Sequence, residues 1–333
     1  MGDVYTVEQF MRFALYHPRV GYYSRRVRGI GRRGDFATSP TLSPALAVAA
    51  AQWARSLPCN RGLVRAWHVI EVGAGDGSLA EAFCGALGPM CRARLRYHIV
   101  EASPPLREIQ ARRLRGRRFR WHGDMAGALA ASGGRATIIA NEVADAFPAT
   151  QWEWSGTRWR EVGVRLGDGD PEEVALEPDM GRALRWCPEC VQRHARALAG
   201  DRFEMHLSYA EWLASWAPSW ARGAMLTIDY GGEDLVPRQG GSLRAYWHHQ
   251  SLKGLDIYLR PGRQDLTADV DFADLARWGE ILGLRNAWSG TQSDFIRNWS
   301  PRAARDPIAA ALADPRGAGG AFRVLDQRRE AAR

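Results

Sequence analysis

Several features of other protein classes are missing from this 333-residue sequence. No apolar run approaches the ~20 residues that a membrane-spanning helix needs, and the richest stretch, 44–54, is short and contains Gln52. No repeat of about 20–50 residues appears, and no low-complexity linker divides the chain. These absences exclude a helical membrane protein and a repeat protein. With 46% hydrophobic and 25% charged residues, the composition indicates a globular protein rather than a disordered, collagen-like or coiled-coil chain.

Lysine is almost absent, since Lys253 is the single lysine among 45 basic residues. The basic residues outnumber 37 acidic ones, which gives a net charge of +8. Such a charge can indicate nucleic-acid binding. However, no arginine stripe alternates with stacking aromatics, and the densest run, 112–120, is typical of an exposed helix end that enters a strand. We therefore expect no nucleic-acid partner and attribute the charge to a preference for arginine over lysine codons.

Cysteine is also scarce, and the five cysteines lie at positions 59, 84, 91, 187 and 190. Their odd number, together with an N-terminus that lacks a charged-then-apolar signal pattern, predicts a reducing compartment, the cytoplasm. Cys187 and Cys190 form a lone CxxC, with His194 and His206 downstream. A structural zinc site usually combines two such half-sites at tighter spacing. We expect two partly buried helical thiols and no metal, while zinc binding and a redox role remain alternatives.

The first half of the chain alternates strand-like and helical segments. A helix is expected over 6–17, where Thr6 and Gln9 form a capping box, and another after Ser43, up to about residue 57. Strand patterns at 67–72, 95–100, 119–122 and 136–140 are separated by loops and helices. This β-loop-α order predicts an α/β protein with a parallel, doubly wound sheet.

The pattern changes after Pro148. Segments 151–154 and 158–166 flank Ser155-Gly156-Thr157, which is typical of a hairpin. An acidic loop is expected over 168–178, helices over 189–198, 210–221 and 271–282, and a further buried strand over 224–228. Residues 240–262 are expected to be rich in loops. These later segments should fold onto the main sheet as insertions.

The strongest local signal is the glycine-rich loop at Gly73, Gly75 and Gly77, between a strand and a helix. Glycines let the backbone turn sharply and approach a ligand closely. Such a loop fits NAD, FAD or S-adenosylmethionine. Glu71 on the preceding strand and Asp76 within the loop favour the last, because negative charge suits a sulfonium and an ammonium better than a pyrophosphate.

Two further acidic residues follow the next strands. Glu101 ends the second strand, where a carboxylate in a nucleoside-binding unit can accept both ribose hydroxyls. Asp124 follows the third strand and could accept a hydrogen bond from an adenine amino group. An ordinary loop aspartate is an equally good interpretation of Asp124.

The segment 141–148 lies at the carboxyl end of the fourth strand, the edge at which open α/β sheets bind their ligands. Glu142 and Asp145 are three residues apart and, within a helical turn, could converge on a cation. The alternative is a pair of solvent-exposed turn residues. We favour convergence, because two carboxylates beside a cofactor are costly unless they are paired.

Motifs spread along nearly the whole chain resemble the MidA-type family of S-adenosylmethionine-dependent methyltransferases, which includes the mitochondrial complex I assembly factor that methylates a protein arginine. The glycine loop is common to many methyltransferases, whereas GDFATSP and NEVADAFP are far more specific. The matching segments are ALYHPRVGYY (14–23), GIGRRGDFATSP (29–40), EVGAGDGSLA (71–80), YHIVEASPPLREIQ (97–110), ANEVADAFPATQW (140–152), LTIDYGG (226–232), GGSLRAYWHH (240–249) and DLTADVDFADLA (265–276).

The resemblance implies a Rossmann-like, doubly wound methyltransferase sheet with an N-terminal helical segment and family-specific insertions. It implies three segments: an N-terminal lid segment 1–60, a cofactor-binding core 61–150, and the rest of the sheet with substrate-side insertions, 151–333. The glycines of the loop would cradle the methionine part of S-adenosylmethionine, and Glu101 would hold its ribose. The segment 35–40 would fold over the cofactor, with Asp35 on its ammonium and Ser39 nearby.

The resemblance also implies that Asn141, Glu142 and Asp145 face the substrate. We count Asn141 among the cofactor-binding residues and Glu142 and Asp145 as catalytic. The expected reaction is N-methylation of an arginine on a protein or peptide, with no membrane partner and with a homodimer left open. Asp269 stands where relatives usually have histidine. Two alternatives therefore remain: methylation of a peptide or small metabolite, and a non-catalytic assembly factor that binds the cofactor.

Overall fold

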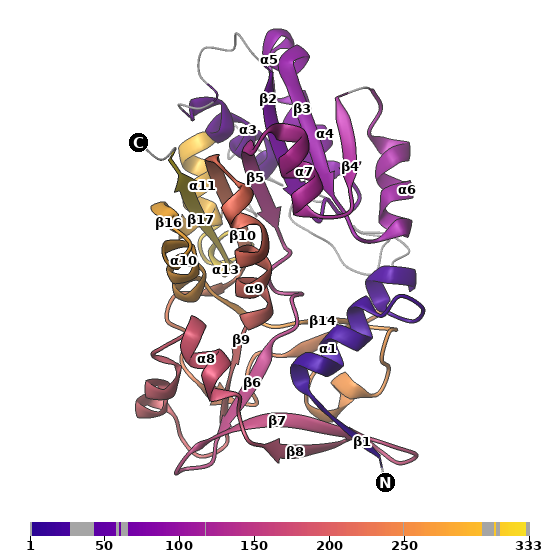
Figure 1. Ribbon diagram of the computed structural model, residues 1–333, viewed down its shortest axis with the longest axis vertical. Coiled ribbons are helices and arrows are strands. Elements are labelled where there is room, and N and C mark those ends of the chain that lie inside the picture. The colour runs from indigo at the N-terminus through magenta and orange to yellow at the C-terminus, as the bar shows by residue number, and fades with distance from the viewer. Residues whose placement is uncertain are drawn as a thin grey trace. The chain divides into compact units, whose positions relative to one another are not determined.

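The computed structural model describes residues 2–26, 43–57, 60, 66–116, 118–248, 250–301, 310 and 314–330 (Figure 1). The chain divides into two compact units, each assembled from three stretches. We call Met1–Val27, Ala144–Leu213 and Gly231–Trp278 the antiparallel unit. We call Arg28–Val143, Ala214–Tyr230 and Gly279–Arg333 the parallel unit. The expected segments 1–60, 61–150 and 151–333 are consecutive, whereas the stretches of the two units alternate along the chain.

The sheet of the parallel unit follows the strand order β16-β17-β10-β5-β2-β3-β4. The strands from β10 to β4 run parallel, which confirms the expected doubly wound α/β fold. β17 is antiparallel to both of its neighbours, so the sheet is mixed rather than wholly parallel. Its strands are β2 (Trp67–Val72), β3 (Leu95–Val100), β4 (Phe119–His122), β5 (Arg135–Asn141), β10 (Arg222–Gly232), β16 (Arg285–Thr291) and β17 (Phe322–Arg329).

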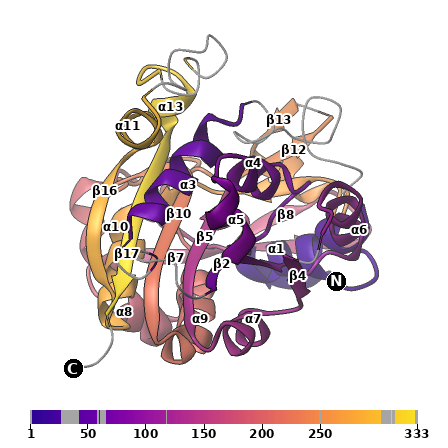
Figure 2. The same ribbon diagram turned by 90° about the horizontal axis from the view of Figure 1, so that it is seen from above.

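Helices cover both faces of this sheet (Figure 2). Helices α3, α4 and α11 pack on one face, over a core that includes Trp53, Phe83 and Tyr97, and α7 packs on the other. The helical segments are α3 (Ala45–Ser56), α4 (Ser78–Gly85), α5 (Pro89–Arg94), α6 (Pro104–Arg113), α7 (Met125–Ser132), η3 (Ala217–Ser219), α11 (Gln292–Trp299) and α13 (Ala318–Ala321).

The sequence explains where the helices next to the glycine loop begin. The Ser103 side chain accepts a hydrogen bond from the Leu106 N–H at the start of α6, and Pro104 occupies the first helical position. Proline is tolerated there, because that position needs no intrahelical N–H. Asp124 caps α7 in the same way, through a 2.8 Å bond from the Gly127 N–H. These caps fix the loops that follow β3 and β4.

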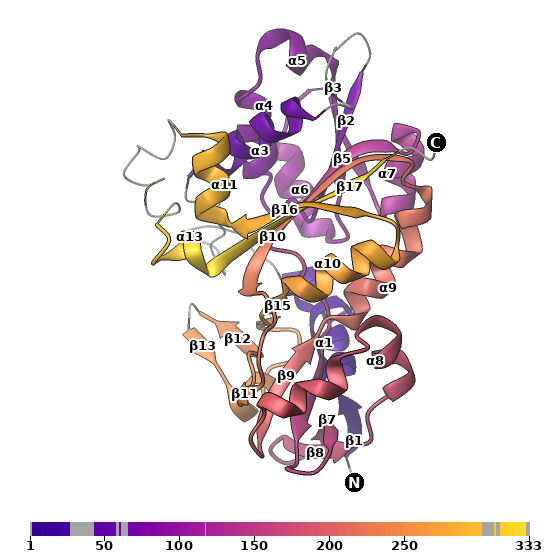
Figure 3. The ribbon, with the colours of Figure 1, turned by 90° about the vertical axis from the view of Figure 1, so that its left-hand side faces the viewer.

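The antiparallel unit contains a sheet of order β1-β7-β6-β9-β11, with β8 added beside β7 (Figure 3). β6 and β7 form the expected hairpin, whereas the expected loop 168–178 contains β8, which pairs with β7. Acidic side chains are compatible with a strand here because this is a half-exposed sheet edge. The strands are β1 (Asp3–Thr6), β6 (Thr150–Trp154), β7 (Trp159–Leu166), β8 (Glu172–Leu176), β9 (Asp201–Met205) and β11 (Arg238–Gln239).

The region expected to be rich in loops, 240–262, contributes strands to a second sheet of order β13-β12-β14. Its strands are β12 (Arg244–Trp247), β13 (Gln250–Leu252) and β14 (Asp265–Thr267), and β15 (Val270–Asp271) pairs with Gly231 and Gly232 at the end of β10. The helical segments that begin in this unit are α1 (Val7–Tyr16), η1 (Tyr22–Arg26), α8 (Met180–Trp186), η2 (Cys190–Arg196), α9 (Leu207–Trp216), η4 (Gly254–Tyr258) and α10 (Phe272–Ile281).

Two local predictions about this unit can be compared with the structure. The capping box of α1 is confirmed, since Thr6 and Gln9 exchange hydrogen bonds of 2.9 and 3.2 Å. Around the CxxC, the expected α-helix is a short 3₁₀ helix, η2, and both thiols are fully buried. The Cys187 thiol donates to Asp274 at 3.6 Å. Within the described part of the chain, no group of three or more His, Cys, Asp or Glu side chains could hold a metal ion.

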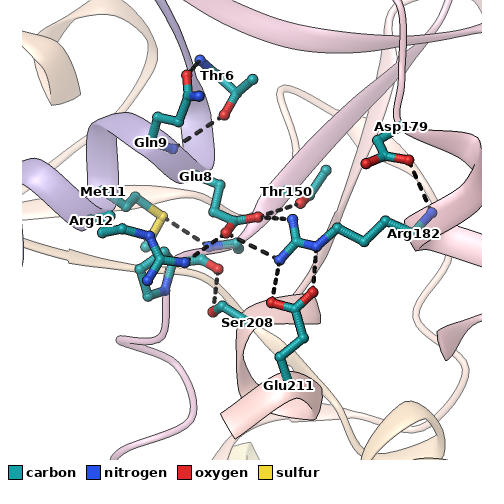
Figure 4. A network of polar contacts seen from close by, with 12 residues as sticks. Thr6, Glu8, Gln9, Met11, Arg12, Thr150, Asp179, Arg182, Ser208 and Glu211 are labelled. Carbon is teal, nitrogen blue, oxygen red and sulfur yellow. Dashed lines mark hydrogen bonds and ion pairs between the residues drawn. The ribbon is translucent and has the colours of Figure 1, made fainter. Parts of the chain in front are cut away.

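A buried ionic network ties the helices of the antiparallel unit together (Figure 4). Glu8 of α1 is only 7% exposed and pairs with the Arg182 guanidinium of α8. Arg182 also donates to both carboxylate oxygens of Glu211 on α9, at 2.6 and 2.9 Å. Burial opposes ionisation of Glu8, but hydrogen bonds from Arg182, Arg12 and Thr150 prevail and lower its pKa. Glu8 is therefore held in the charged form.

None of the described helices is long and apolar enough to cross a bilayer.

Candidate active site

The glycine loop lies at the carboxyl end of β2 and leads into α4. Gly73, Gly75 and Gly77 have φ angles of 62°, 55° and 84°, the left-handed region that favours glycine. A Cβ on Gly73 would also lie 2.9 Å from the Val143 Cγ2 atom, so side chains are excluded there for two reasons. The loop consequently has bare backbone, packed against the turn that follows β5.

Asp76 closes the loop by contacts within the protein. Its carboxylate accepts hydrogen bonds from the Ser78 N–H at 3.0 Å and the Ser78 hydroxyl at 2.6 Å. Its second oxygen pairs with the Arg113 guanidinium at 2.9 Å. Asp76 therefore connects the start of α4 to the end of α6, and its predicted attraction for a sulfonium stays a prediction.

Glu71 lies beneath the loop and is only 2% exposed. It accepts a 2.8 Å hydrogen bond from the Tyr97 hydroxyl. Burial raises its pKa to about 8, although the Tyr97 bond acts in the opposite direction. The carboxyl group is therefore mostly protonated at neutral pH, and a cationic ligand nearby would favour its ionisation.

Glu101 directly follows β3 and is only 6% exposed. Its Oε1 atom accepts a hydrogen bond from the Ser103 N–H at 2.9 Å, and its Oε2 atom accepts one from the Gln110 amide at 3.0 Å. A carboxylate offers about four lone-pair sites. Because each oxygen can accept more than one hydrogen bond, Glu101 keeps acceptor capacity for a ligand.

Gln110, which was not among the predicted site residues, is 0% exposed. The Gln110 Nε2 atom donates to Glu101 and also to the Gly75 carbonyl, at 2.9 Å. The Trp121 indole N–H donates to the Gln110 Oε1 atom at 3.0 Å. One available signal was the position of Gln110 two turns after Ser103, the cap of α6, within a segment of the family resemblance.

The turn after β5 brings Asn141 and Glu142 beside the glycine loop. Asn141 is 8% exposed, and its Oδ1 atom finds no hydrogen-bond partner among the described residues. Glu142 has a φ of 53°, a sparsely populated conformation that recurs at functional sites. The Val143 N–H donates to the Asp229 carboxylate at 3.0 Å. Asp229, in the last part of β10, was also not among the predicted site residues.

Asp145 belongs to the antiparallel unit, because the boundary between the units falls between Val143 and Ala144. It is 8% exposed, and its backbone carbonyl accepts a hydrogen bond from the Ala268 N–H at 3.1 Å. Nearby, the Tyr23 hydroxyl donates to Asp265 at 2.7 Å. Burial, with the charges of Asp265 and Asp145, raises the pKa of Tyr23. The expected convergence of Asp145 with Glu142 stays a prediction.

The remaining predicted site residues have separate outcomes. Asp35 and Ser39 lie outside the described residues. Asp124 is exposed and caps α7, the arrangement expected of a loop aspartate, and its proposed contact with adenine stays a prediction. Asp269, the departure from the relatives, pairs with Arg238 and Arg244 at 2.6 Å each. Asp269 therefore forms ion pairs within the antiparallel unit.

The geometry defines a polar site at the carboxyl edge of the parallel strands. Three strand ends contribute to it: β2 leads into the glycine loop, β3 into the Glu101 carboxylate, and β5 ends at Asn141 with its side-chain oxygen. This edge is where open α/β sheets bind nucleoside ligands. The groups can accept hydrogen bonds from hydroxyls and from an ammonium group.

A family model described as "Putative S-adenosyl-L-methionine-dependent methyltransferase" matches residues 45–289. The chain belongs to this family. The match confirms the expected class of activity, methyl transfer, and S-adenosylmethionine as the cofactor. It covers both the glycine loop and the turn after β5.

The chain is similar to curated proteins named "Protein arginine methyltransferase NDUFAF7, mitochondrial". The Xenopus tropicalis protein is 29% identical over 325 residues, which cover 88% of this chain and 71% of the relative. The Danio rerio protein is 28% identical over 321 residues, with 88% and 72% covered. A crystal structure from Burkholderia thailandensis, bound to S-adenosylhomocysteine, has a TM-score of 0.81, 26% identity, and coverage of 98% and 88%.

The residues at the site fit S-adenosylmethionine. The buried Oδ1 atom of Asn141, which lacks a donor, can accept a hydrogen bond from an ammonium group. The loop beside it carries glycine at three positions with positive φ, and glycine lets a backbone approach a ligand closely. Glu101 has acceptor capacity for a ribose. When bound, the cofactor supplies the electrophilic methyl group, and the protein must position it.

Proposed function

We propose that this protein methylates an arginine side chain of a protein substrate. The observation that carries the proposal is the similarity, over 88% of this chain, to relatives named protein arginine methyltransferases. The chemistry of the site agrees with it. A guanidinium is a cation that needs acidic partners, and Glu142 supplies a carboxylate beside the glycine loop.

On the cofactor side, we assign the ribose hydroxyls to Glu101 and the ammonium group to Asn141. The supporting observations are the remaining acceptor capacity of Glu101 and the missing donor at Asn141. The backbone of the glycine loop would contact the methionine part. Asp35, Ser39, Glu71 and Asp124 remain proposed cofactor contacts.

On the substrate side, Glu142 would hold the guanidinium through paired hydrogen bonds and orient one nitrogen toward the methyl group. Arginine is charged at any physiological pH and is a poor nucleophile, so a carboxylate must localise its charge and assist proton loss. Asp145 is proposed as the second carboxylate. The φ of 53° at Glu142 and the bond from Val143 to Asp229 favour one fixed direction for the Glu142 side chain.

The test is transfer of isotopically labelled methyl groups from S-adenosylmethionine to candidate proteins, followed by amino-acid analysis for methylarginine. We expect Glu142→Gln and Asp145→Asn each to lower turnover by roughly 10²–10⁴-fold, the usual contribution of a general base. Affinity for S-adenosylhomocysteine should stay within about threefold of wild type, because neither carboxylate holds the cofactor. The exposed Glu108→Gln on α6 is the matched control.

Other outcomes would redirect the proposal. Label recovered in a small metabolite would favour the alternative biosynthetic methyltransferase. Cofactor binding without transfer to any candidate would favour a non-catalytic assembly factor. Normal turnover in both amide variants would remove Glu142 and Asp145 from catalysis.

The place of the protein in the cell is a separate proposal. We propose a cytoplasmic location on the basis of cysteine usage, whereas the curated relatives are named as mitochondrial. The relatives' names indicate a protein substrate, and a homodimer stays a prediction. Cell fractionation tests the location, and light scattering of the purified protein tests the homodimer.

A further inference from the structure

The Gln110 side chain joins three separate segments of the parallel unit. Its amide nitrogen donates to the Gly75 carbonyl at 2.9 Å and to the Glu101 Oε2 atom at 3.0 Å. Its amide oxygen accepts from the Trp121 indole at 3.0 Å. These contacts use both amide hydrogens and connect the glycine loop, the end of β3 and β4. The side chain is 0% exposed, so water does not compete for these bonds.

The chemistry of its neighbours fixes the orientation of the amide. The Trp121 indole nitrogen can only donate a hydrogen bond, and the Gly75 carbonyl can only accept one. The Gln110 oxygen must therefore face Trp121, and its nitrogen must face Gly75 and Glu101. A flipped amide would set two acceptors against each other on one side and two donors on the other. The side chain thus has one allowed arrangement.

That arrangement holds two groups in a fixed relation. The Ser103 N–H holds one oxygen of Glu101 and Gln110 holds the other. Rotation of the carboxylate would break at least one of these bonds. Because the same Gln110 nitrogen also holds the Gly75 carbonyl, Glu101 and the loop are positioned together.

We propose that Gln110 is a positioning residue that aligns Glu101 with the glycine loop, so that one cofactor molecule can contact both. It touches no reacting atom and acts through these two partners. This inference rests on the proposed role of Glu101 in holding the ribose. It predicts that Gln110 contributes to cofactor affinity even where the fold is unchanged.

Two variants separate positioning from packing. Gln110→Met keeps the volume and removes all three hydrogen bonds, and we expect affinity for S-adenosylhomocysteine to fall about tenfold. Gln110→Glu keeps the shape and the acceptor toward Trp121 but places a second acceptor against Glu101. Because two facing carboxylates must share a proton, its affinity should recover by about tenfold between pH 8 and pH 6. Wild type and Gln110→Met should lack that recovery.

Calorimetric titration with S-adenosylhomocysteine measures the affinities, and urea unfolding measures stability. Gln327→Met is the matched control, because Gln327 is a buried glutamine of the same unit whose amide donates to Asn286. It should lose stability without losing affinity. Affinities within twofold of wild type in both Gln110 variants, together with lower stability, would reduce Gln110 to a packing role and overturn the inference.

A double variant distinguishes the two possible failures. If Gln110 acts through Glu101, the loss caused by Gln110→Met should shrink to less than about threefold in a Glu101→Ala background. If Glu101→Ala alone leaves affinity unchanged, the ribose assignment fails. If Glu101→Ala weakens binding and Gln110→Met does not, only the positioning role fails.

Discussion

The two units accommodate some of their buried ionisable groups in different ways. In the parallel unit, burial raises the pKa of Glu71 to about 8 and lowers that of His98 to about 3, so both are neutral near pH 7. In the antiparallel unit, arginine partners overcome burial and lower the pKa of both Glu8 and Asp269, so both are charged. Exceptions there include Glu161, Asp271 and His206. Burial raises the pKa of Glu161 to about 7 and that of Asp271 to about 6, and it lowers the pKa of His206 to about 4.

Burial is the main cause of the neutral state of His98, and a row of imidazoles adds to it. His98 lies between His68 and His122, with ring nitrogens 2.9 Å apart on each side. Each of these hydrogen bonds needs one donor nitrogen and one acceptor nitrogen. A neutral imidazole offers one of each, so neutral histidines can form both hydrogen bonds. The neighbouring Arg120 also disfavours a further positive charge. This part of the sheet is thus held together by neutral hydrogen bonds.

Paired charges and neutral buried groups contribute differently to the protein. Paired charges such as Glu8 and Arg182 fix the positions of helices, because an uncompensated buried charge is costly. Neutral or partly satisfied groups such as Glu71 and Asn141 are poor structural ties, but they can respond to a ligand. Glu71 and Asn141 lie next to the glycine loop, whereas Asp76 within the loop is a paired charge.

The largest expected effect is on the ionic network. Arg182→Met leaves Glu8 with a buried charge that is only partly compensated by Arg12 and Thr150. We expect the free energy of unfolding to fall by about 3 kcal/mol, measured by urea titration. The exposed pair of Arg165 and Glu172 supplies the control, since Arg165→Met should cost less than about 1 kcal/mol. Equal effects of the two substitutions would contradict the structural role assigned to the buried ion pair.

The next effect concerns a carboxylate of the parallel unit. Glu101→Ala removes charge-assisted bonds to the ribose, and we expect S-adenosylhomocysteine binding to weaken by ~1.5–3 kcal/mol in calorimetry. Burial raises the pKa of Glu101, so its charge adds little to the stability of the ligand-free protein. Urea unfolding should therefore change less than the affinity does. Glu108→Ala on α6 should alter neither quantity.

The smallest effect is the pH dependence of stability. Burial lowers the pKa of folded His98 to about 3, below its ordinary value near 6.5. Between these values the unfolded chain binds more protons, so stability falls as the pH falls. His98 alone should cost about 2 kcal/mol between pH 7 and pH 5. His98→Leu should flatten this dependence in urea titrations at the two pH values, and an unchanged slope would assign the acid sensitivity to other groups.

Local patterns predicted much of the parallel unit. The bounds of β2, β3 and β4 match the expected ranges, because each strand is short, is rich in aromatic or β-branched residues, and is followed by a glycine or an acidic residue. β16, β17 and α11 were not expected. β17 contains Asp326, Gln327 and three arginines, so its sequence lacks the apolar pattern of a buried strand. Asp326 and Gln327 are nevertheless buried, because they form hydrogen bonds with Trp53 and Asn286, which are distant in sequence. Such partners cannot be identified from local periodicity.

The candidate site divides in the same way. The glycine loop, Glu101 and Glu142 were recognisable, because their residue types stand at the ends of strands. The parts of Gln110 and Asp229 were not, since each depends on contacts with residues far away in the chain. The interleaving of the units was not predicted, because the change of pattern after Pro148 lies near only one of the points at which the chain passes from one unit to the other.

The position of β10 has a consequence for folding kinetics. Its Leu226 pairs with Ile139 of β5 on one side and with Asp326 of β17 on the other. The middle of the sheet therefore cannot close until segments from both halves of the chain have met. Contacts of such long sequence separation slow folding and leave hydrophobic strand edges exposed meanwhile. We expect refolding from denaturant to be slow and sensitive to protein concentration, and assistance from a chaperone to raise the yield.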